Sequence, residues 1–565
     1  MLKGVKIKKM SNIALGFSVG HSRGAAITIN GELRVAIANE RITRIKTDHS
    51  DRLPLESIKY CLTALGLTYN DVDAWVWNTT EESSDVPGQF DKMIGVSRDK
   101  LHFLPHHQAH AYSSYYASDF KESAVIVADA MGSIYNNDTP IKEWYTLDTS
   151  DLEEDQQLAE GFSIYHFKEG QNKPEAVYKK WVRYPFDHHH EGSIGYFYGM
   201  GAKQLVYDEK HHSWSAGKLM GLASYARKSE VDSVDHKSIR TENDLYVPCI
   251  PIKEDLVNHK SDFQAKADVA GLYQREQELN SLHLAKMAKS ITGSDSLCVA
   301  GGSFLNCNTN ELIIKHGLFK NNYFIPPADD SGIAIGCVFY GATILNPKVK
   351  FRKSWMSPYL GITYTDQEIE EAVISNDDFV YANKMSYKQM IDVSSTLLLD
   401  NKVIGWFQRG SETGPRALGN RSIIANPSSK WIVEYINSDI KKREWYRPFA
   451  PSVLYSEQSK IFELDTYSPY MLVTTKVKKE WQNKIPAVTH FDGTSRYQSV
   501  TQKNNKTYHD VISAFYKKSG IPVLLNTSFN GPEEPIVETP SDAIKTMIKN
   551  DLYAVVINNY IIYRR

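Results

Sequence analysis

Two histidines one helical turn apart are the first residues of this sequence whose types and spacing could do chemistry. His106 and His110 lie four positions apart, so on a helix both imidazoles would face one side and could bind one divalent ion. Asp129 follows an apolar run, and Asp330 lies in a later Asp-Asp-Ser-Gly turn. Two imidazoles and two carboxylates suit a catalytic iron, zinc or manganese site. We therefore predict a metal site built from these four residues.

Other interpretations of the histidines stay open at this point. By itself, a His-x-x-x-His pair more often caps a helix or packs in a core. Denser groups occur at His188–His190 and His211–His212, but the side chains of consecutive residues diverge on a loop. We interpret these two groups as loop or substrate-edge residues rather than as metal ligands.

Basic side chains collect in glycine- and proline-rich stretches of the C-terminal half. Guanidinium and ammonium groups in such loops can form forked hydrogen bonds to phosphate or carboxylate oxygens. Two polar side chains of a strand end accompany them. The sequence therefore predicts a local anion site, with plain surface charge as the alternative. Its members are Arg416, Lys441, Arg447, Arg496, Asn526 and Ser528.

Glycines follow two apolar runs that we expect to be strands. Gly132 comes shortly after the run that ends at Asp129, and Gly301 and Gly302 follow Ser296–Ala300 and precede Asn306 and a helical pattern. A strand, a tight glycine turn and a helix are typical of α/β domains that hold phosphates on backbone N–H groups.

The elements that must position these residues can also be read from the pattern. Asn30-Gly31 predicts a hairpin between two apolar segments, because both turn residues tolerate a positive φ. Helices are expected over 55–65 and after Pro105. The pair Thr539-Pro540 with Asp542 predicts the start of a C-terminal helix. A final hairpin should turn at Asn558-Asn559.

The length and net charge of the chain limit the classes of protein to which it can belong. A chain of 565 residues exceeds the ~250–300 residues of a single core. With 65 Lys and Arg against 67 Asp and Glu, the net charge of −2 disfavours a nucleic-acid coat or membrane-surface protein. Five scattered cysteines disfavour a disulfide framework and predict a cytoplasmic protein. No window approaches the ~20 apolar residues of a membrane span.

With these residues in hand, the chain resembles the O-carbamoyltransferases of the NodU/CmcH family. That family includes the nodulation-factor, cephem-antibiotic and tobramycin carbamoyltransferases. The matching stretches occur in the family's order along nearly the whole chain. They are 40–46, 106–110, 217–223, 301–306, 414–421, 447–451, 492–496 and 525–531.

The resemblance implies an α/β protein with two catalytic domains. Residues 1–346 would form an actin-like ATPase (ASKHA) domain, similar to the tRNA threonylcarbamoyl transferase, which transfers the carbamoyl group and holds the metal. Residues 347–365, which are basic and proline-marked, would be a linker. Residues 366–565 would form a YrdC-like α/β domain that makes carbamoyl-adenylate.

The resemblance also assigns roles to single residues. His21 would lie beside the acceptor and orient or deprotonate its hydroxyl group. The family usually has Asp at the next position, where this chain has Ser22, so no carboxylate is offered there. The four predicted ligands would hold Fe2+ or another divalent metal. The predicted anion-site residues would bind carbamoyl phosphate and ATP, with Arg416, Lys441, Arg447 and Arg496 also catalytic. The positions near the bound nucleotide would be Gly132, Gly301, Gly302 and Asn306.

The expected function follows from this resemblance. The enzyme would be an ATP-dependent transferase of one-carbon groups that uses carbamoyl phosphate, with Mg2+ accompanying ATP. It would carbamoylate a hydroxyl of a small natural product or sugar, as in antibiotic biosynthesis. No nucleic-acid or membrane partner is expected, and the oligomeric state stays open, a homodimer included. The main alternative is a tRNA threonylcarbamoyladenosine-type modification enzyme, which predicts a basic face for RNA. A non-catalytic scaffold and a sugar kinase leave the arginine loops or the second domain unexplained.

Overall fold

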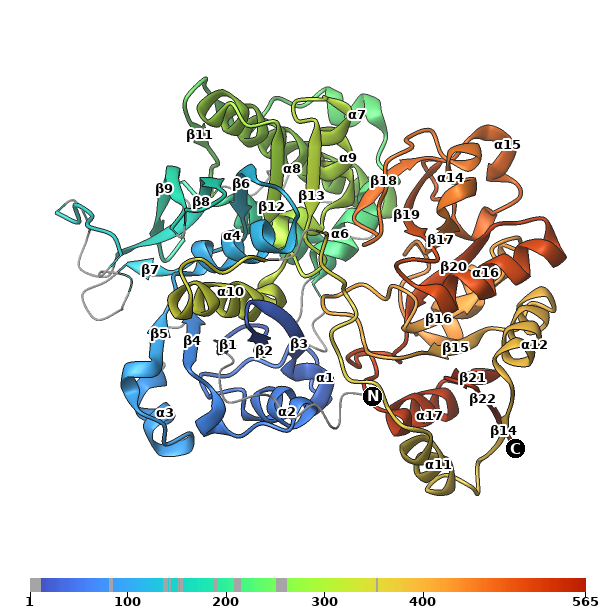
Figure 1. Ribbon diagram of the computed structural model, residues 1–565. Helices are drawn as coiled ribbons and strands as arrows, with labels where there is room; N and C mark the ends of the chain where they lie inside the picture. Colours follow the sequence, from blue (N-terminus) through green and yellow to red (C-terminus); the bar gives the residue numbers. More distant parts are fainter. Residues whose placement is uncertain are drawn as a thin grey trace. The chain divides into compact units, whose positions relative to one another are not determined.

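The computed structural model describes most of the chain, and the described residues fall into two compact units (Figure 1). Unit 1 comprises residues up to Asn39 together with Thr47–Met356, and unit 2 comprises Glu40–Lys46 together with Ser357–Arg565. The described ranges are 12–80, 85–135, 141, 144–150, 152, 156–171, 173–186, 191–207, 215–249, 262–351 and 354–565.

The first sheet of unit 1 has the strand order β3-β2-β1-β4-β5. β1 pairs antiparallel with β2 and parallel with β4, while β2–β3 is antiparallel and β4–β5 is parallel. The predicted hairpin is confirmed, since Asn30 and Gly31 take φ values of 54° and 79° between β2 and β3. The strands are β1 (Ile13–Val19), β2 (Gly24–Ile29), β3 (Glu32–Ala38), β4 (Ala74–Thr79) and β5 (Leu101–Phe103).

The second sheet of unit 1 repeats this arrangement. Its main path reads β9-β8-β6-β12-β13, with β6–β8 and β8–β9 antiparallel and β6–β12 and β12–β13 parallel. Each strand therefore has a counterpart in the first sheet, with β6 in the place of β1. This doubled order is that of the actin-like ATPase fold expected for the N-terminal half. The strands are β6 (Glu122–Ala128), β8 (Gln157–Lys168), β9 (Glu175–Tyr184), β12 (Ser296–Ala300) and β13 (Asn321–Phe324), with β7 (Ile134–Tyr135) at the edge of β8.

Two helices lie between these sheets (Figure 1). α4 (His106–Ala117) follows β5 of the first sheet and contacts β6, β8 and β12 of the second. α10 (Ile333–Leu345) follows β13 of the second sheet and contacts β1, β2 and β4 of the first. The two helices also pack on each other. Each sheet is thus followed in the chain by a helix that packs on the other sheet.

The remaining helices of unit 1 surround this centre. The predicted helix over 55–65 is confirmed as α2 (Leu55–Leu65), which packs on β2 and β3. The long helix α8 contacts β6 and β8, and α5, α6, α7 and α9 pack against it. Their bounds are α3 (Val86–Met93), α5 (Ile194–Val206), α6 (Ala216–Ala223), α7 (Lys228–Asp232), α8 (Phe263–Thr292) and α9 (Cys307–Lys315), with the short strands β10 (Ile239–Arg240) and β11 (Leu245–Tyr246) nearby.

Unit 2 is built on one mixed sheet with the order β14-β22-β21-β15-β16-β20-β17-β19-β18. The predicted C-terminal hairpin is confirmed, because β21 and β22 pair antiparallel across the Asn558-Asn559 turn. The strands are β14 (Val380–Lys384), β15 (Ile404–Phe407), β16 (Arg421–Ala425), β17 (Ala450–Leu454), β18 (Val473–Lys476), β19 (Thr494–Val500), β20 (Val523–Ser528), β21 (Ala554–Ile557) and β22 (Tyr560–Arg564).

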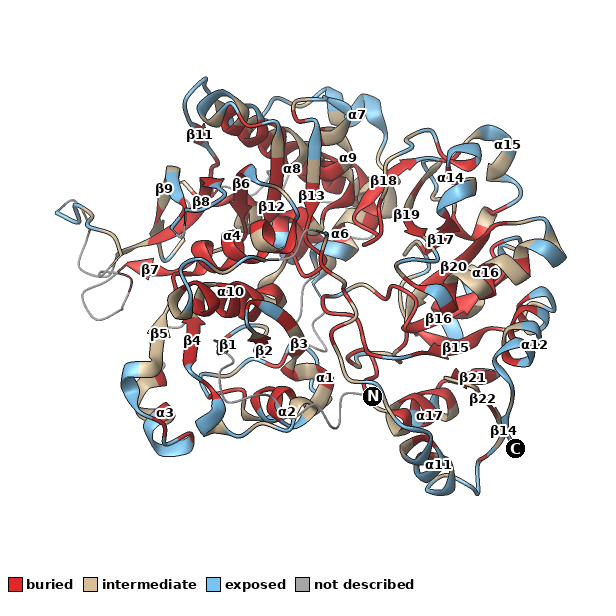
Figure 2. Cartoon of the chain, viewed as in Figure 1, coloured by how far each residue is buried: buried red, intermediate tan, exposed pale blue. Residues whose placement is uncertain are grey.

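The core of unit 2 lies between this sheet and a helix pair, as the buried residues in Figure 2 show. α12 (Tyr387–Leu399) and α16 (Lys506–Ser519) pack together, and their apolar side chains meet those of the central strands. α11 (Asp366–Ile374) and α17 (Pro540–Lys549) pack on each other, and α17 contacts β15 and β21. Thr539 and Asp542 form the expected capping box of α17. The shorter helices are α13 (Trp431–Tyr435), α14 (Tyr455–Ile461) and α15 (Lys479–Gln482).

A short piece of the N-terminal half belongs to unit 2, whereas the sequence placed it in the first domain. α1 (Asn39–Thr43) begins it. Arg41 donates to the Gly414 carbonyl, and Arg44 donates to the carbonyls of Pro535 and Ile536. These arginine–carbonyl bonds join positions 373 to 492 residues apart along the chain, so local sequence gave no sign of them.

The segment predicted as a linker, 347–365, contains the boundary between the units. Its described residues are packed rather than extended. The ring of Phe351 lies 4.2 Å from that of Tyr116 in unit 1, and the Tyr359 hydroxyl donates to the Leu418 carbonyl in unit 2. Aromatic side chains within the basic segment therefore attach each part of it to its own unit.

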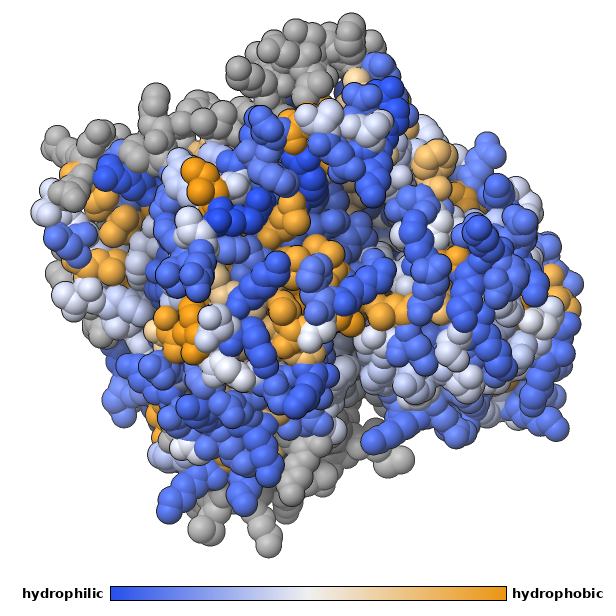
Figure 3. All heavy atoms as spheres, turned by 90° about the horizontal axis from the view of Figure 1, so that it is seen from above, coloured by the Kyte–Doolittle hydropathy of each residue, from blue (hydrophilic) through white to orange (hydrophobic). Residues whose placement is uncertain are grey.

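Neither a membrane-spanning helix nor a disulfide occurs among the described residues. None of the helices in the described ranges is long and apolar enough to cross a lipid bilayer. On the face shown in Figure 3, hydrophobic side chains form separate groups between hydrophilic ones. All five cysteines are buried as free thiols, in agreement with the predicted lack of a disulfide framework.

The contact of α4 with α10 gives a first prediction. A Cβ at Gly336 would lie 1.8 Å from the Ala109 carbonyl oxygen, so Gly336→Ala must push the two helices apart. Overpacking of this kind costs about 1–3 kcal/mol or more. We expect a lower free energy of unfolding in urea denaturation. Gly217→Ala is the control, since its nearest neighbour would be 3.7 Å away; a Gly336→Ala protein as stable as this control would contradict the tight contact.

Candidate functional site

The four residues predicted as metal ligands come together in unit 1. His106 and His110 lie on the first turns of α4, and their ring centroids are 4.8 Å apart. Asp129 follows the last residue of β6, and Asp330 lies in the turn just before α10. One donor atom from each residue falls within 4.8 Å of all the others. We call this group the His/Asp cluster.

Direct hydrogen bonds satisfy only part of the His/Asp cluster. His106 Nε2 lies 3.1 Å from Asp129 Oδ2 and 3.4 Å from Asp330 Oδ1. His110 Nε2 lies 3.4 Å from both carboxylates, yet neither of its ring nitrogens has a hydrogen-bond partner among the described residues. Buried polar atoms are rarely left without partners unless a metal or water completes the site. Two imidazoles and two carboxylates aimed at one point therefore fit a divalent transition metal.

The charges of the His/Asp cluster stabilise one another. Burial alone would lower the pKa of His106, but the charge of Asp330 and the hydrogen bond to Asp129 raise it to about 10. Burial opposes ionisation of the two carboxyl groups, yet the neighbouring histidines hold the pKa values of Asp129 and Asp330 well below their ordinary value. Both acids are therefore carboxylates and available as ligands.

Outer contacts fix the ring of His106. Its Nδ1 lies 3.0 Å from Asn78 Oδ1, and the Asn78 amide in turn donates to the Leu104 carbonyl. The amide oxygen can only accept, so Nδ1 carries the proton and Nε2 is left for the cluster. The sequence did not single out Asn78, which lies on β4, because nothing local connects it with α4.

His21 lies beside the His/Asp cluster. Its Nδ1 is 3.5 Å from Asp330 Oδ2 and 3.0 Å from the hydroxyl of Ser22, and its side chain is 59% exposed. The hydrogen bond to Asp330 raises the pKa of His21. Among the described residues, Asp330 is the carboxylate within ion-pair distance of this histidine.

The positions expected near a nucleotide have different surroundings. Gly132 and Gly301 are required by packing, since a Cβ would lie 2.6 Å from Glu160 Cβ and 2.2 Å from the Ala128 carbonyl oxygen, respectively. A Cβ on Gly302 would meet nothing within 4 Å. The side chain of Asn306 caps α9 and exchanges hydrogen bonds with Gln274. Of the four, Gly302 alone borders open space.

Unit 2 contains a second group of charged residues, which is cationic. Lys441 is buried and donates to Ser528 and to Asn530, with its Nζ 2.9 Å from the Asn530 carbonyl oxygen. Burial, with the charges of Arg443 and Arg447, lowers the pKa of Lys441 well below its ordinary value. Ser528 thus meets Lys441 as the sequence grouping implied. We call Lys441, Arg443 and Arg447, with Arg416 and Arg496 around them, the cationic cluster.

The arginines of the cationic cluster repel one another. Burial and the charge of Arg447 lower the pKa of Arg443 well below its ordinary value, with a contribution from Arg496. Burial also lowers the pKa of Arg447; the nearby Glu444 carboxylate, 3.9 Å from the guanidinium, opposes this effect and Arg416 adds to it. Like charges brought together out of water favour a bound anion, which would offset both the desolvation and the repulsion.

One member of the predicted anion site has a supporting role that the sequence did not specify, and one residue of the cationic cluster was not predicted. Asn526 is buried, and its amide donates to the Ala417 carbonyl, so it supports the loop that carries Arg416. Arg443 was missed, although it lies between Lys441 and Arg447. Its Nε donates to Asn437 Oδ1 and its guanidinium lies 4.8 Å from the Phe449 ring centroid. The Lys-Lys-Arg run was its only signal.

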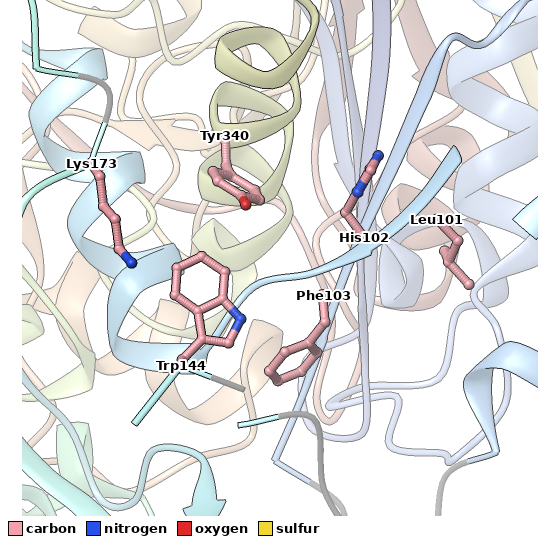
Figure 4. A pocket seen from close by; sticks show the side chains of 6 residues that line it. All are labelled: Leu101, His102, Phe103, Trp144, Lys173 and Tyr340. Carbon is pink, nitrogen blue, oxygen red and sulfur yellow. The ribbon is translucent and has the colours of Figure 1, made fainter. Parts of the chain in front are cut away.

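A separate pocket of about 380 Å³ opens in unit 1 (Figure 4). Three aromatic rings, those of Phe103, Trp144 and Tyr340, surround it with His102, Leu101 and Lys173. The Lys173 ammonium lies 5.0 Å from the Trp144 ring centroid. No member of the His/Asp cluster lines this pocket. The histidine groups at 188–190 and 211–212 lie outside the described residues.

The comparisons with known proteins show the family to which the chain belongs. Models of the carbamoyltransferase N-terminus and C-terminus match residues 88–339 and 395–564. The chain is 30% identical to nodulation protein NolNO of Sinorhizobium fredii, over 96% of this chain and 79% of that protein. It is 30% identical to a 3'-hydroxymethylcephem-O-carbamoyltransferase of Amycolatopsis lactamdurans, over 58% of this chain and 61% of that protein.

Among solved structures, HypF of T. kodakarensis is similar with a TM-score of 0.39 and 12% identity, over 61% of this chain and 50% of that one. The sequence relatives and the two matching models, which lie one in each half of the chain, identify the protein. It belongs to the carbamoyltransferase family, as an O-carbamoyltransferase of the NodU/CmcH type.

Proposed function

We propose that this enzyme is an ATP-dependent O-carbamoyltransferase that takes its carbamoyl group from carbamoyl phosphate. The carbamoyl group would pass through a carbamoyl-adenylate to a hydroxyl of a small natural product or sugar. The observation that carries the proposal is the crowding of the buried Lys441 with the half-buried Arg443 and Arg447, whose charges lower one another's pKa values. Such a cationic cluster favours a small, highly charged anion, and carbamoyl phosphate and ATP are both of this kind.

The first half-reaction would take place in unit 2, the YrdC-like domain of the family resemblance. Water cleaves carbamoyl phosphate to carbamate and phosphate. A carbamate oxygen then attacks the α-phosphorus of ATP, and pyrophosphate leaves with the electron pair of the broken P–O bond. Buried cations would neutralise the charge that develops on the phosphates. A site closed to water would also protect carbamate, which is unstable in solution.

The second half-reaction would take place in unit 1, which resembles the tRNA threonylcarbamoyl transferase. The acceptor oxygen attacks the carbonyl carbon of the adenylate, AMP leaves, and the hydroxyl proton must go to a base. His21 is the exposed imidazole beside the His/Asp cluster, so it can meet an acceptor from solvent. Asp330 and Ser22 hold its Nδ1, which leaves Nε2 to orient the hydroxyl or take its proton.

The His/Asp cluster would hold a divalent metal, Fe2+ by the family resemblance, and Mg2+ would accompany ATP. The donor set and the unpartnered nitrogens of His110 support this assignment. When bound, the metal would supply Lewis-acid chemistry at the phosphate oxygens of the adenylate. Asn78 would keep the proton of His106 on Nδ1, so that Nε2 can bind the metal.

The cationic cluster predicts that anions stabilise the protein. Inorganic pyrophosphate should raise the Tm of the wild type, because a ligand that binds only the folded state adds about 2.7 kcal/mol of stability at 100 times its Kd. Arg443→Gln should show at most half of this rise in Tm, since it removes a half-buried cation of the cluster. Lys503→Ala removes an exposed cation of unit 2 and should keep the full rise. Equal shifts in both variants would contradict an anion site at the cationic cluster.

The two half-reactions should be separable by mutation. With ATP, Mg2+ and carbamoyl phosphate but no acceptor, the wild type should release pyrophosphate only when carbamoyl phosphate is present. Arg447→Ala should reduce this release about 100-fold or more, the usual effect of removing a charge-stabilising donor. His110→Ala should retain it, because His110 lies in the His/Asp cluster of unit 1.

Lys503→Ala is the matched control for loss of one positive charge in unit 2. Hydroxylated small molecules can then be screened by mass spectrometry for the gain of one carbamoyl group, which His110→Ala should not produce. If the wild type releases no pyrophosphate with carbamoyl phosphate, the adenylate route is wrong.

A further inference from the structure

His107, between the two ligand histidines, has contacts that the proposed mechanism does not use. Its side chain is fully buried on the first turn of α4. Nε2 lies 3.2 Å from Asp129 Oδ1, and Nδ1 lies 2.8 Å from the hydroxyl of Ser163 on β8. The ring therefore joins a residue of the His/Asp cluster to the second sheet of unit 1.

The direction of these two hydrogen bonds follows from the groups involved. The Asp129 carboxylate can only accept, so His107 Nε2 must carry the hydrogen and donate it. A neutral imidazole then has its lone pair on Nδ1, which accepts the hydroxyl hydrogen of Ser163. The Asp129 carboxylate thus fixes the tautomer of His107, and the Ser163 hydroxyl stabilises that tautomer by donating to Nδ1.

This bond decides which oxygen of Asp129 faces the cluster. His107 engages Oδ1, and Oδ2 lies 3.1 Å from His106 Nε2 and 3.4 Å from His110 Nε2. Without the Oδ1 bond, the carboxylate could rotate about its Cβ–Cγ bond. Carboxylates that bind metals are usually held in this way by a hydrogen bond to the second oxygen.

A buried ion pair fixes the backbone of the same turn. Glu160 Oε2 accepts the backbone N–H groups of His107 and Ser133, at 3.1 and 3.0 Å. Lys179 neutralises Glu160 and lies over the rings of Tyr145, Tyr165 and Trp181. A carboxylate at a helix N-terminus also complements the helix dipole. His107 is thus held at its main chain as well as at its ring.

We propose that His107 is a positioning residue of the His/Asp cluster, which sets the carboxylate of Asp129 for metal binding through the Ser163–His107–Asp129 hydrogen bonds. The inference rests on the metal site of the proposed function. His107 would touch neither substrate nor metal, and its effect would reach the metal only through Asp129.

The test measures metal affinity in the absence of catalysis. Metal-free protein is titrated with Mn2+ by calorimetry, and unfolding is followed by circular dichroism in the presence of a chelator. His107→Ala should weaken Mn2+ binding about 10–100-fold, the usual effect of losing an outer contact to a metal ligand. His107→Gln can still place an N–H near Asp129 Oδ1 and should recover most of the affinity.

His166→Ala is the matched control. His166 is also a buried histidine bonded to a carboxylate, with Nε2 2.8 Å from Glu122 Oε1, and it lies on the same strand as Ser163. It should keep the Mn2+ affinity of the wild type. Ser163→Ala removes only the hydroxyl that donates to His107 Nδ1. It should weaken Mn2+ binding by less than His107→Ala does. It is the second test variant if His107→Ala does not fold.

The outcomes separate this inference from the one on which it rests. If His107→Ala and Ser163→Ala both bind Mn2+ as the wild type does, the positioning role is wrong and the metal site stands. If His107→Gln loses as much affinity as His107→Ala, and both unfold early in the chelator, the role of His107 is purely structural. If the wild type binds Mn2+ no better than His110→Ala, the metal site itself is wrong and the positioning role with it.

Discussion

The close packing of α4 against α10 is the constraint on which the site in unit 1 depends. Gly336 lets the two helices approach to a distance that no side chain would allow, with the carbonyl of Ala109 opposite. Each helix begins at a residue of the His/Asp cluster or just after one, His106 for α4 and Asp330 for α10. The helix contact therefore brings together ligands that lie more than 200 residues apart in sequence.

The doubled topology of unit 1 explains why the cluster forms where it does. β1 and β6 are equivalent strands of the two sheets, and His21 and Asp129 follow their ends. α4 and α10 are likewise equivalent, because each follows the last strand of its sheet and packs on the other sheet. The cluster and His21 thus take one strand end and one helix start from each half. Two strand ends and two helix N-termini give polar groups a common meeting point inside an apolar core.

The charged clusters of the two units suit ligands of opposite charge. The His/Asp cluster of unit 1 stabilises buried carboxylates with histidines, and its four donors converge on a point that suits a cation. Unit 2 places the buried Lys441 beside the half-buried Arg443 with further cations close by, an arrangement that suits an anion. A formal charge of −2 over 565 residues reveals neither group, because each is a local arrangement of a few side chains.

Local patterns were enough to determine the elements and the residue types at both sites. The Asn30-Gly31 turn, the His106–His110 spacing and the capping residues Thr539 and Asp542 act within a few positions, so the sequence alone predicted them. The tertiary structure decided which distant groups complete each site. Asn78, Ser163 and Glu160 support the histidines of α4 across the sheets, and Arg41 binds the Gly414 carbonyl from the other half of the chain. Such contacts depend on strand pairing and helix crossing, which set distances between residues that local sequence leaves undefined.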